Sequence, residues 1–198
     1  GHWAFEPAPR EPAPSRPLSP SRLPPEGLDE PPVSSPLTGD SQARFQRGRL
    51  IHRLLQTLPD LPPSEWEAAA ARFLSASAHG LNGDAQAEIA GSVARVLNDE
   101  KFADVFAPGG RAEVPVVGRI EFGGKPHLVS GQIDRLCVVG DDVLVIDYKT
   151  NRPPPRKVEE ASPAYVAQMA AYRALLQRIH PGRAIRCALL WTETPALM

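Results

Sequence analysis

The chain has 198 residues, of which 42% are apolar, and its 22 basic and 23 acidic residues give a formal net charge of −1. This length allows one globular domain of common size with a tail. This nearly neutral net charge excludes an overall basic field of the kind that indicates nucleic-acid binding, although clusters of basic residues could still bind nucleic acid locally. The sequence shows no apolar run near 18 residues and no signal-like leader, and it therefore predicts a cytoplasmic protein without a membrane span.

Cysteine content limits the possible metal and redox chemistry. Cys137 and Cys187 are the only cysteines in the sequence. Two cysteines are too few for an all-cysteine zinc site or a four-thiolate iron–sulfur cluster, and at this length they do not indicate a disulfide scaffold. A reducing compartment is the better fit.

The first part of the chain is rich in proline. Residues 1–36 contain 11 of the 23 prolines, which remove backbone donors and leave little apolar surface to bury. We therefore expect an extended or disordered linker over residues 1–40, joining an absent upstream part to a folded domain over residues 41–198. A proline-rich ligand for another domain is the alternative interpretation.

Three helices are expected after the linker. The first begins near Ser41 and ends at Pro59. One of its faces carries Phe45, Gly48, His52 and Leu55. The second follows a capping box formed by Ser64 and Glu67, and the third starts near Asp84. All three are interpreted as packing elements.

The hydrophobic period then changes to two, which is typical of strands. The expected strands are AEVPVVGRIEF (112–122), HLVSGQIDRLCVV (127–139) and DVLVIDYK (142–149). A helix follows, with Ser162 as N-cap and an end near His180, and then a nearly continuous apolar strand, AIRCALLWT. The fold class is thus α/β, or α+β in some schemes: an antiparallel three-strand meander plus a strand–helix–strand unit, with the N-terminal helices packed on the sheet.

Gly140 and Asp141 form a plausible two-residue hairpin turn, and this turn fixes the strand register. It predicts that Asp134 lies opposite Asp147 and that Gln132 lies opposite Lys149. Like charges about 4 Å apart repel by on the order of 4 kcal/mol at an effective dielectric of about 20. A divalent cation such as Mg²⁺ would offset this repulsion, and Lys149 would then orient a water or balance charge on a transition state. In the alternative interpretation, one of the aspartates forms a surface ion pair with Arg135 or Lys149, which contributes little energy.

These residues resemble the signature of the PD-(D/E)XK nucleases, with Asp134, Asp147 and Lys149 at the signature positions. More narrowly, GQIDRL, VIDYKTN and YVAQMAAY resemble the nuclease domains of RecB and AddA helicase-nucleases. Gln168 and Tyr172 match the Gln-x-x-x-Tyr motif of that branch. The upstream GRLIHRLLQTLP is similar to its first motif, in which a helix carries a histidine, here His52.

The resemblance implies a restriction-endonuclease-like core and a set of site residues. His52, Asp134, Asp147 and the main-chain carbonyl of Tyr148 would hold Mg²⁺, with Mn²⁺ as a substitute and no iron–sulfur cluster. The implied catalytic residues are Asp134, Asp147, Lys149, Gln168 and Tyr172. The implied activity is metal-dependent hydrolysis of DNA, most simply single-stranded DNA. It would be carried out by the C-terminal nuclease domain of an AddA-type polypeptide, in which an upstream helicase domain and an AddB-like partner process double-strand breaks.

Several alternatives stay open on the sequence alone. His52 and Tyr172 both fit ordinary core positions. Arg44, Arg47, Arg49 and Arg53 either border a DNA path or form a solvated face, and Glu113 matches a family position of unassigned role. The chain could also be a non-catalytic module that binds DNA or a partner, or a nuclease active only in the assembled complex.

Overall fold

The computed structural model describes residues 17–20, 39–122, 124–151 and 153–197. The helices are α1 (Gly39–Thr57), α2 (Trp66–Leu74), α3 (Gly83–Leu97), α4 (Ala103–Phe106) and α5 (Pro163–Ile179). The strands are β1 (Arg111–Phe122), β2 (Lys125–Val139), β3 (Asp142–Lys149), β4 (Ala184–Trp191) and β5 (Ala196–Leu197). No helix in the described ranges is long and apolar enough to cross a bilayer.

The described strands form one mixed sheet in the order β1-β2-β3-β4-β5. The pairs β1–β2 and β2–β3 are antiparallel, β3 and β4 run parallel, and β5 returns antiparallel to β4. The predicted meander and the parallel strand after α5 are therefore confirmed. The short closing strand β5 was not predicted.

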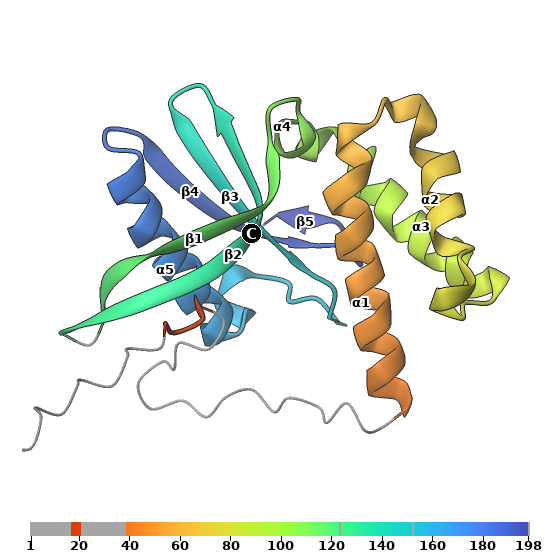
Figure 1. Cartoon of the computed structure of the whole chain (residues 1–198), viewed down its shortest axis with the longest axis horizontal. Helices are drawn as coiled ribbons and strands as arrows, with labels where there is room; N and C mark the ends of the chain where they lie inside the picture. The colour runs from red at the N-terminus through yellow and green to blue at the C-terminus, as the bar shows by residue number, and fades with distance from the viewer. Residues whose placement is uncertain (1–16, 21–38, 123, 152, 198) are drawn as a thin grey trace, which may run out of the picture.

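Helices cover the two faces of the sheet (Figure 1). Helix α5 packs against β4, β1 and β3, and the core on this side includes Val143, Val145 and Tyr172. Helices α1 to α4 lie on the other side, where the second core includes Ile146 and Tyr148. Residues 143 to 148 of β3 thus contribute to both cores, which is the pattern of a strand buried on both faces.

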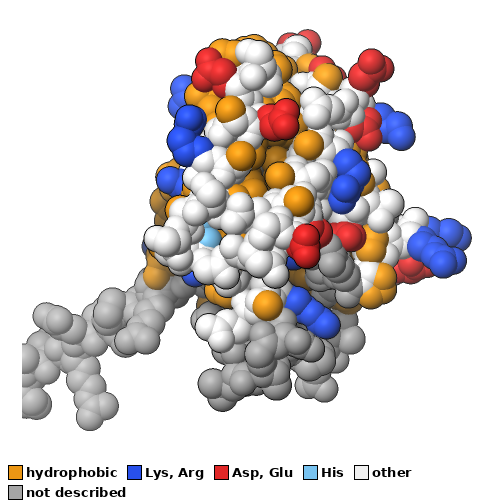
Figure 2. All heavy atoms as spheres, turned by 90° about the vertical axis from the view of Figure 1, so that its right-hand side faces the viewer, with side chains coloured by type: hydrophobic (Ala, Val, Ile, Leu, Met, Phe, Trp, Pro, Cys, Tyr) orange, Lys and Arg blue, Asp and Glu red, His pale blue; other side chains and the backbone are white. Residues whose placement is uncertain are grey.

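The outer face of the α-helical layer is visible in Figure 2, where apolar side chains gather around a hollow among scattered charged ones. A cavity of about 470 Å³ lies between α2 and α3 and is lined mainly by small or apolar residues, among them Trp66, Ala70 and Ala94.

One of the two predicted helix caps differs from the structure. The predicted capping box of Ser64 and Glu67 is wrong: a 3₁₀ turn, Pro63–Glu65, precedes α2, and Glu65 is its N-cap without a side-chain hydrogen bond. The proline at the start of that turn favours this tighter geometry. Ser162 is the N-cap of α5 as expected, but its side chain makes no capping hydrogen bond.

The predicted linker over residues 1–40 lies mostly outside the described residues. Within the described segment 17–20, Leu18 forms a parallel bridge with Val129 of β2. The Leu18 amide donates to the Leu128 carbonyl at 2.8 Å, and the Ser130 amide donates to the Leu18 carbonyl at 3.0 Å. This part of the proline-rich sequence is thus attached to the sheet.

Gly48 determines how closely α1 approaches the segment after β3. A Cβ atom at Gly48 would lie 2.8 Å from Thr150 Oγ1, closer than side-chain atoms pack. The absence of a side chain at Gly48 therefore permits the close contact between α1 and the residue that follows β3.

We expect Gly48→Ala to lower the free energy of unfolding by about 1–3 kcal/mol, because the added methyl group overpacks against Thr150. Urea unfolding followed by circular dichroism measures this change. Gly91→Ala in α3 is the matched control, since its new Cβ would meet only Arg95 Nη1 at 3.6 Å and should stabilise by about 0.5–1 kcal/mol. Equal effects of the two changes, or no rescue of Gly48→Ala by Thr150→Ala, would contradict the contact.

Candidate active site

The hairpin register is the first element of the site. Gly140 has φ 58° at the turn, and β2 and β3 pair from Val139–Asp142 to Arg135–Ile146. This confirms the predicted turn and register, but the ladder ends one pair before Asp134 and Asp147. The predicted pairing of Gln132 with Lys149 is likewise not formed.

Where the β2–β3 ladder ends, a side chain replaces the main-chain hydrogen-bond acceptor. Asp134 Oδ2 accepts a hydrogen bond of 2.7 Å from the main-chain amide of Tyr148. A carboxylate thus occupies the place of a main-chain acceptor, and the charge-assisted bond is stronger than the ladder bond it replaces. Because Asp134 needs room for its side chain between the strands, β2 and β3 separate at this level.

The β1–β2 ladder is interrupted at the same level. Ala112–Arg135 and Val114–Ile133 are paired, but Glu113, which has φ 53°, is not paired with Asp134. Positive φ is costly for a residue with a side chain and usually marks a special position. Glu113, Asp134 and Asp147 are therefore the residues at which both ladders lose their regular pairing.

The interruption also shifts the alternation of β2 side chains between the two faces of the sheet. Ile133 and Leu136, three residues apart, both contact the core under α5, whereas an unbroken strand would place them on opposite faces. Arg135 instead points to the other face, where its Nε donates to the Val105 carbonyl at 2.6 Å. Arg135 is 1% exposed, so the alternative in which it pairs with an aspartate on the surface is wrong.

Asp147 lies among polar partners from β3 and α5. Gln168 Nε2 donates to Asp147 Oδ1 at 2.8 Å, and Lys149 Nζ lies 2.5 Å from Asp147 Oδ2. Lys149 Nζ also donates to Gln168 Oε1 at 3.3 Å and lies 3.8 Å from the ring centroid of Tyr165. The structure thus brings together Asp147, Lys149 and Gln168 as the sequence predicted.

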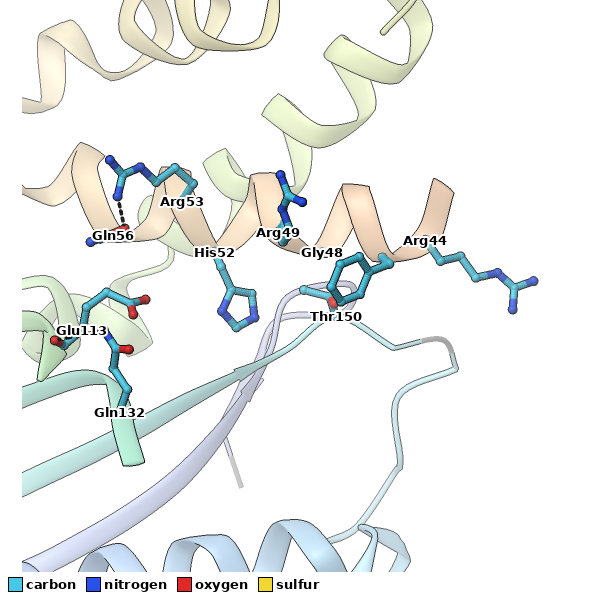
Figure 3. Close-up of a pocket in the computed structure, with 10 residues that line it drawn as sticks. Arg44, Gly48, Arg49, His52, Arg53, Gln56, Glu113, Gln132 and Thr150 are labelled. Atoms are coloured by element: carbon cyan, nitrogen blue, oxygen red, sulfur yellow. Dashed lines mark hydrogen bonds between the residues drawn. The ribbon is translucent and has the colours of Figure 1, made fainter. Parts of the chain in front are cut away.

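His52 approaches from α1, on the opposite side of the sheet from α5. Figure 3 shows its ring pointing from the helix toward the strands, and its Nδ1 lies 3.7 Å from Asp134 Oδ2. Its ring meets that of Tyr148 edge-on, with centroids 5.6 Å apart. Burial lowers the pKa of His52, partly opposed by the charge of Asp147, which favours the neutral imidazole that metals bind.

Tyr172 supports β2 and has no free ring face. It is 2% exposed, and its hydroxyl donates to the Gln132 carbonyl at 2.7 Å. Tyr172 therefore exposes no ring on which a base could stack, and it occupies the core position that the sequence also allowed. The phenol instead fixes the strand that carries Asp134.

The donor set fits a divalent cation, although no three histidine, cysteine or acidic residues of the described ranges are already grouped to hold one. Asp147 Oδ2 is buried without a hydrogen bond, and the ammonium of Lys149 lies 2.5 Å from it. A buried carboxylate needs a positive charge close by, and a cation is a second group that could supply it. Two carboxylates with an imidazole nearby offer ligands of the kind that such ions accept.

The two aspartates influence each other electrostatically. Burial raises the pKa of Asp134 to about 7, and the negative charge of Asp147 adds to this rise, while the hydrogen bond from the Tyr148 amide opposes it. Burial also raises the pKa of Glu113. A bound cation would favour the charged carboxylates and relieve this repulsion.

Two supporting contacts were not predicted. Thr192, 0% exposed, donates its amide to the Lys149 carbonyl at 3.0 Å and thereby holds the end of β3. Arg47, named above as a candidate DNA contact, is instead bound to Glu88 at 2.6 Å and Glu193 at 2.9 Å. For the contact between Thr192 and Lys149, the only sequence signal was the position of Thr192 at the end of the apolar segment.

Comparison with known proteins agrees with this geometry. The model of the PD-(D/E)XK nuclease superfamily matches residues 26–196. The chain belongs to this superfamily, whose nucleases typically use divalent metal ions.

Two individual proteins are similar to parts of the chain. It is 35% identical over 78 residues to an ATP-dependent helicase/nuclease subunit of Pelotomaculum thermopropionicum, a match that covers 39% of this chain and 6% of that protein. The chain thus spans a small fraction of that relative. A solved structure described as "Crystal structure of SSO0001" aligns with a TM-score of 0.36 and 16% identity, over 79% of this chain and 76% of the other, and is too distant to inform the site.

The raised pKa of Asp134 predicts a pH dependence of stability without metal. A carboxyl whose folded pKa exceeds its ordinary value of 3.8 stabilises the fold fully below that value, and this contribution is lost as the pH rises through about 7. The full effect is on the order of 4 kcal/mol. In EDTA, the melting temperature of the natural chain should therefore fall, relative to Asp134→Asn, between pH 4 and 7.5.

The difference between the two proteins isolates Asp134, because His52 is present in both and its lowered pKa acts in the opposite direction as the pH falls. The amide oxygen introduced by Asp134→Asn can still accept from the Tyr148 amide, so the structural hydrogen bond is kept. A pH-independent difference in melting temperature would contradict the assignment.

Proposed function

We propose that this chain is a metal-dependent deoxyribonuclease domain that hydrolyses phosphodiester bonds of single-stranded DNA. The observation that carries the proposal is the cluster of Asp134, Asp147, Lys149 and Gln168, placed where the strands separate. Acidic residues beside a lysine provide both a cation site and a positive charge for the reacting phosphate. Membership of the nuclease superfamily supports this interpretation.

The two aspartates, His52 and the main-chain carbonyl of Tyr148 would hold the cation, Mg²⁺ by preference or Mn²⁺ in its place. When bound, such an ion lowers the pKa of a coordinated water and offsets charge on the phosphate. The neutral imidazole of His52 is suited to this task, and the amide of Tyr148 keeps the Asp134 carboxylate oriented.

Lys149 would orient the attacking water or balance the charge that develops on the phosphate oxygens. Gln168 holds this lysine beside Asp147, since its amide nitrogen donates to the aspartate and its oxygen accepts from the ammonium. Tyr172 is a positioning residue, because it reaches the site only through the Gln132 carbonyl. Water is the nucleophile in this scheme, and no covalent intermediate forms.

The parent assembly is part of the same proposal. The similarity to a helicase/nuclease protein supports a domain that follows a helicase motor in the same polypeptide. We infer an AddAB-type complex, with an AddB-like partner and DNA as substrate, that acts in double-strand break repair in the cytoplasm. The domain boundaries proposed above, a linker over residues 1–40 and the nuclease over 41–198, fit this arrangement.

Cleavage of 5′-labelled single-stranded DNA in Mg²⁺ tests the nuclease activity. We expect Asp147→Ala to reduce the rate by at least about 100-fold, because it removes a carboxylate that binds the ion and positions Lys149. Asp142→Ala is the matched control, since this aspartate lies at the turn end of β3 and pairs there with the exposed Arg186. Equal cleavage by the natural chain and Asp147→Ala would refute the proposal.

Lys149→Met separates the cation site from the reaction. Without the ammonium, Asp147 should still bind Mn²⁺, because the competing positive charge is gone, while cleavage should fall by at least about 100-fold. Isothermal titration measures the binding and the labelled DNA measures the rate. Failure of the natural chain to bind either Mg²⁺ or Mn²⁺ would favour a non-catalytic binding module.

A further inference from the structure

A cavity of about 550 Å³ runs along α1 beside the candidate site. One stripe of the helix lines it, from Arg44 and Phe45 past His52 to Gln56, and Glu113 and Gln132 lie across from it. Figure 3 shows Arg44 extending beyond the helix at the end away from Glu113. The cavity is therefore continuous with His52. Its Arg44 end is basic, whereas at the other end Arg53 lies on the same side as Glu113 and offsets its charge.

The basic end contains arginines that are free to bind a ligand. Arg44 and Arg49 are exposed, and within the described part of the chain neither forms an ion pair or a side-chain hydrogen bond. Arg47, on the same helix, is held by two glutamates on the side away from the cavity. The helix thus uses one arginine for packing and leaves the others on the cavity side.

Phe45 lies between these arginines in the sequence and lines the same cavity. Its side chain is 66% exposed although it is large and apolar, and no ring in the described ranges stacks on it. An exposed aromatic ring beside unpaired arginines is the combination that binds single-stranded nucleic acid, because the ring stacks on an unpaired base and the guanidinium groups neutralise phosphates. Duplex DNA offers no free base face for such stacking.

We propose that Arg44, Phe45 and Arg49 hold the nucleotides on one side of the scissile phosphate, with a base stacked on Phe45. This proposal rests on the proposed nuclease function for the identity of the ligand. Phe45 and His52 are seven positions apart, which is about 10 Å along a helix. At about 3.4 Å per nucleotide of a stacked strand, this length accommodates about three nucleotides. Arg44 and Arg49, the lining arginines without an ion pair or a side-chain hydrogen bond among the described residues, both precede His52 on α1, so the strand is held from the Phe45 side.

The groove is the part of this cavity lined by Arg44, Phe45 and Arg49. Fluorescence anisotropy of a labelled 12-nucleotide oligothymidine in EDTA tests DNA binding in the groove without cleavage. Phe45→Leu should weaken binding at least about fivefold, because it keeps apolar bulk but loses the ring, while Phe45→Tyr should stay within about twofold of the natural chain. An oligonucleotide with abasic positions should bind the natural chain and Phe45→Leu equally well. Thermal melts establish that each variant is folded, as expected for so exposed a position.

The arginines are tested by the salt dependence of the same measurement. The double change Arg44→Gln and Arg49→Gln should reduce the slope of log affinity against log salt by about 1.4, since each phosphate contact of a single strand contributes about 0.7. Arg72→Gln is the matched control, because Arg72 is also exposed but lies on α2. Equal slopes for the double variant and the control would overturn the proposal.

The binding experiments and the cleavage experiment test the groove proposal and the nuclease proposal separately. If Phe45→Leu binds the oligonucleotide as the natural chain does, or if the natural chain binds none in EDTA, the groove proposal fails whether or not DNA is cut. If the binding pattern appears but the natural chain does not cleave in Mg²⁺, the nuclease proposal fails and the groove stands.

Discussion

The hydrogen bond from the Tyr148 amide to the Asp134 carboxylate is the interaction on which the site depends. It ends the β2–β3 ladder, fixes the direction of one carboxylate and keeps the separated strands at a defined spacing. Without an acceptor, the amide would be a buried donor without a partner, which is costly. The chain therefore gains structure and a functional arrangement from the same contact.

The opening between the strands also explains why both helical layers contribute to one site. His52 comes from α1 on one face, and Gln168 comes from α5 on the other. In a regular sheet the backbone would separate these side chains. Here the interruption at Glu113 and Asp134 turns β2, so that groups from both faces converge on the two aspartates.

Much of the fold was predictable because its signals are local. Gly140 marked the turn, and the alternation on either side set the register as far as Arg135 and Ile146. The end of the ladder was not predictable, because period-two patterning does not show where a side chain replaces a main-chain acceptor. The left-handed backbone of Glu113 is equally invisible in a pattern of polar and apolar residues. Among the site residues, motif spacing placed Asp147, Lys149 and Gln168 together, whereas only burial decided between the two interpretations of Tyr172.

The bridge made by Leu18 has a consequence for self-association. Beyond its pairing with β3, β2 would present unpaired amides and carbonyls, and such an edge invites strands from other molecules. Leu18 occupies part of that edge, and the preceding Pro17 has no N–H to offer an incoming strand. This contact leaves fewer free main-chain groups for association with other molecules, at the strand that also carries Asp134.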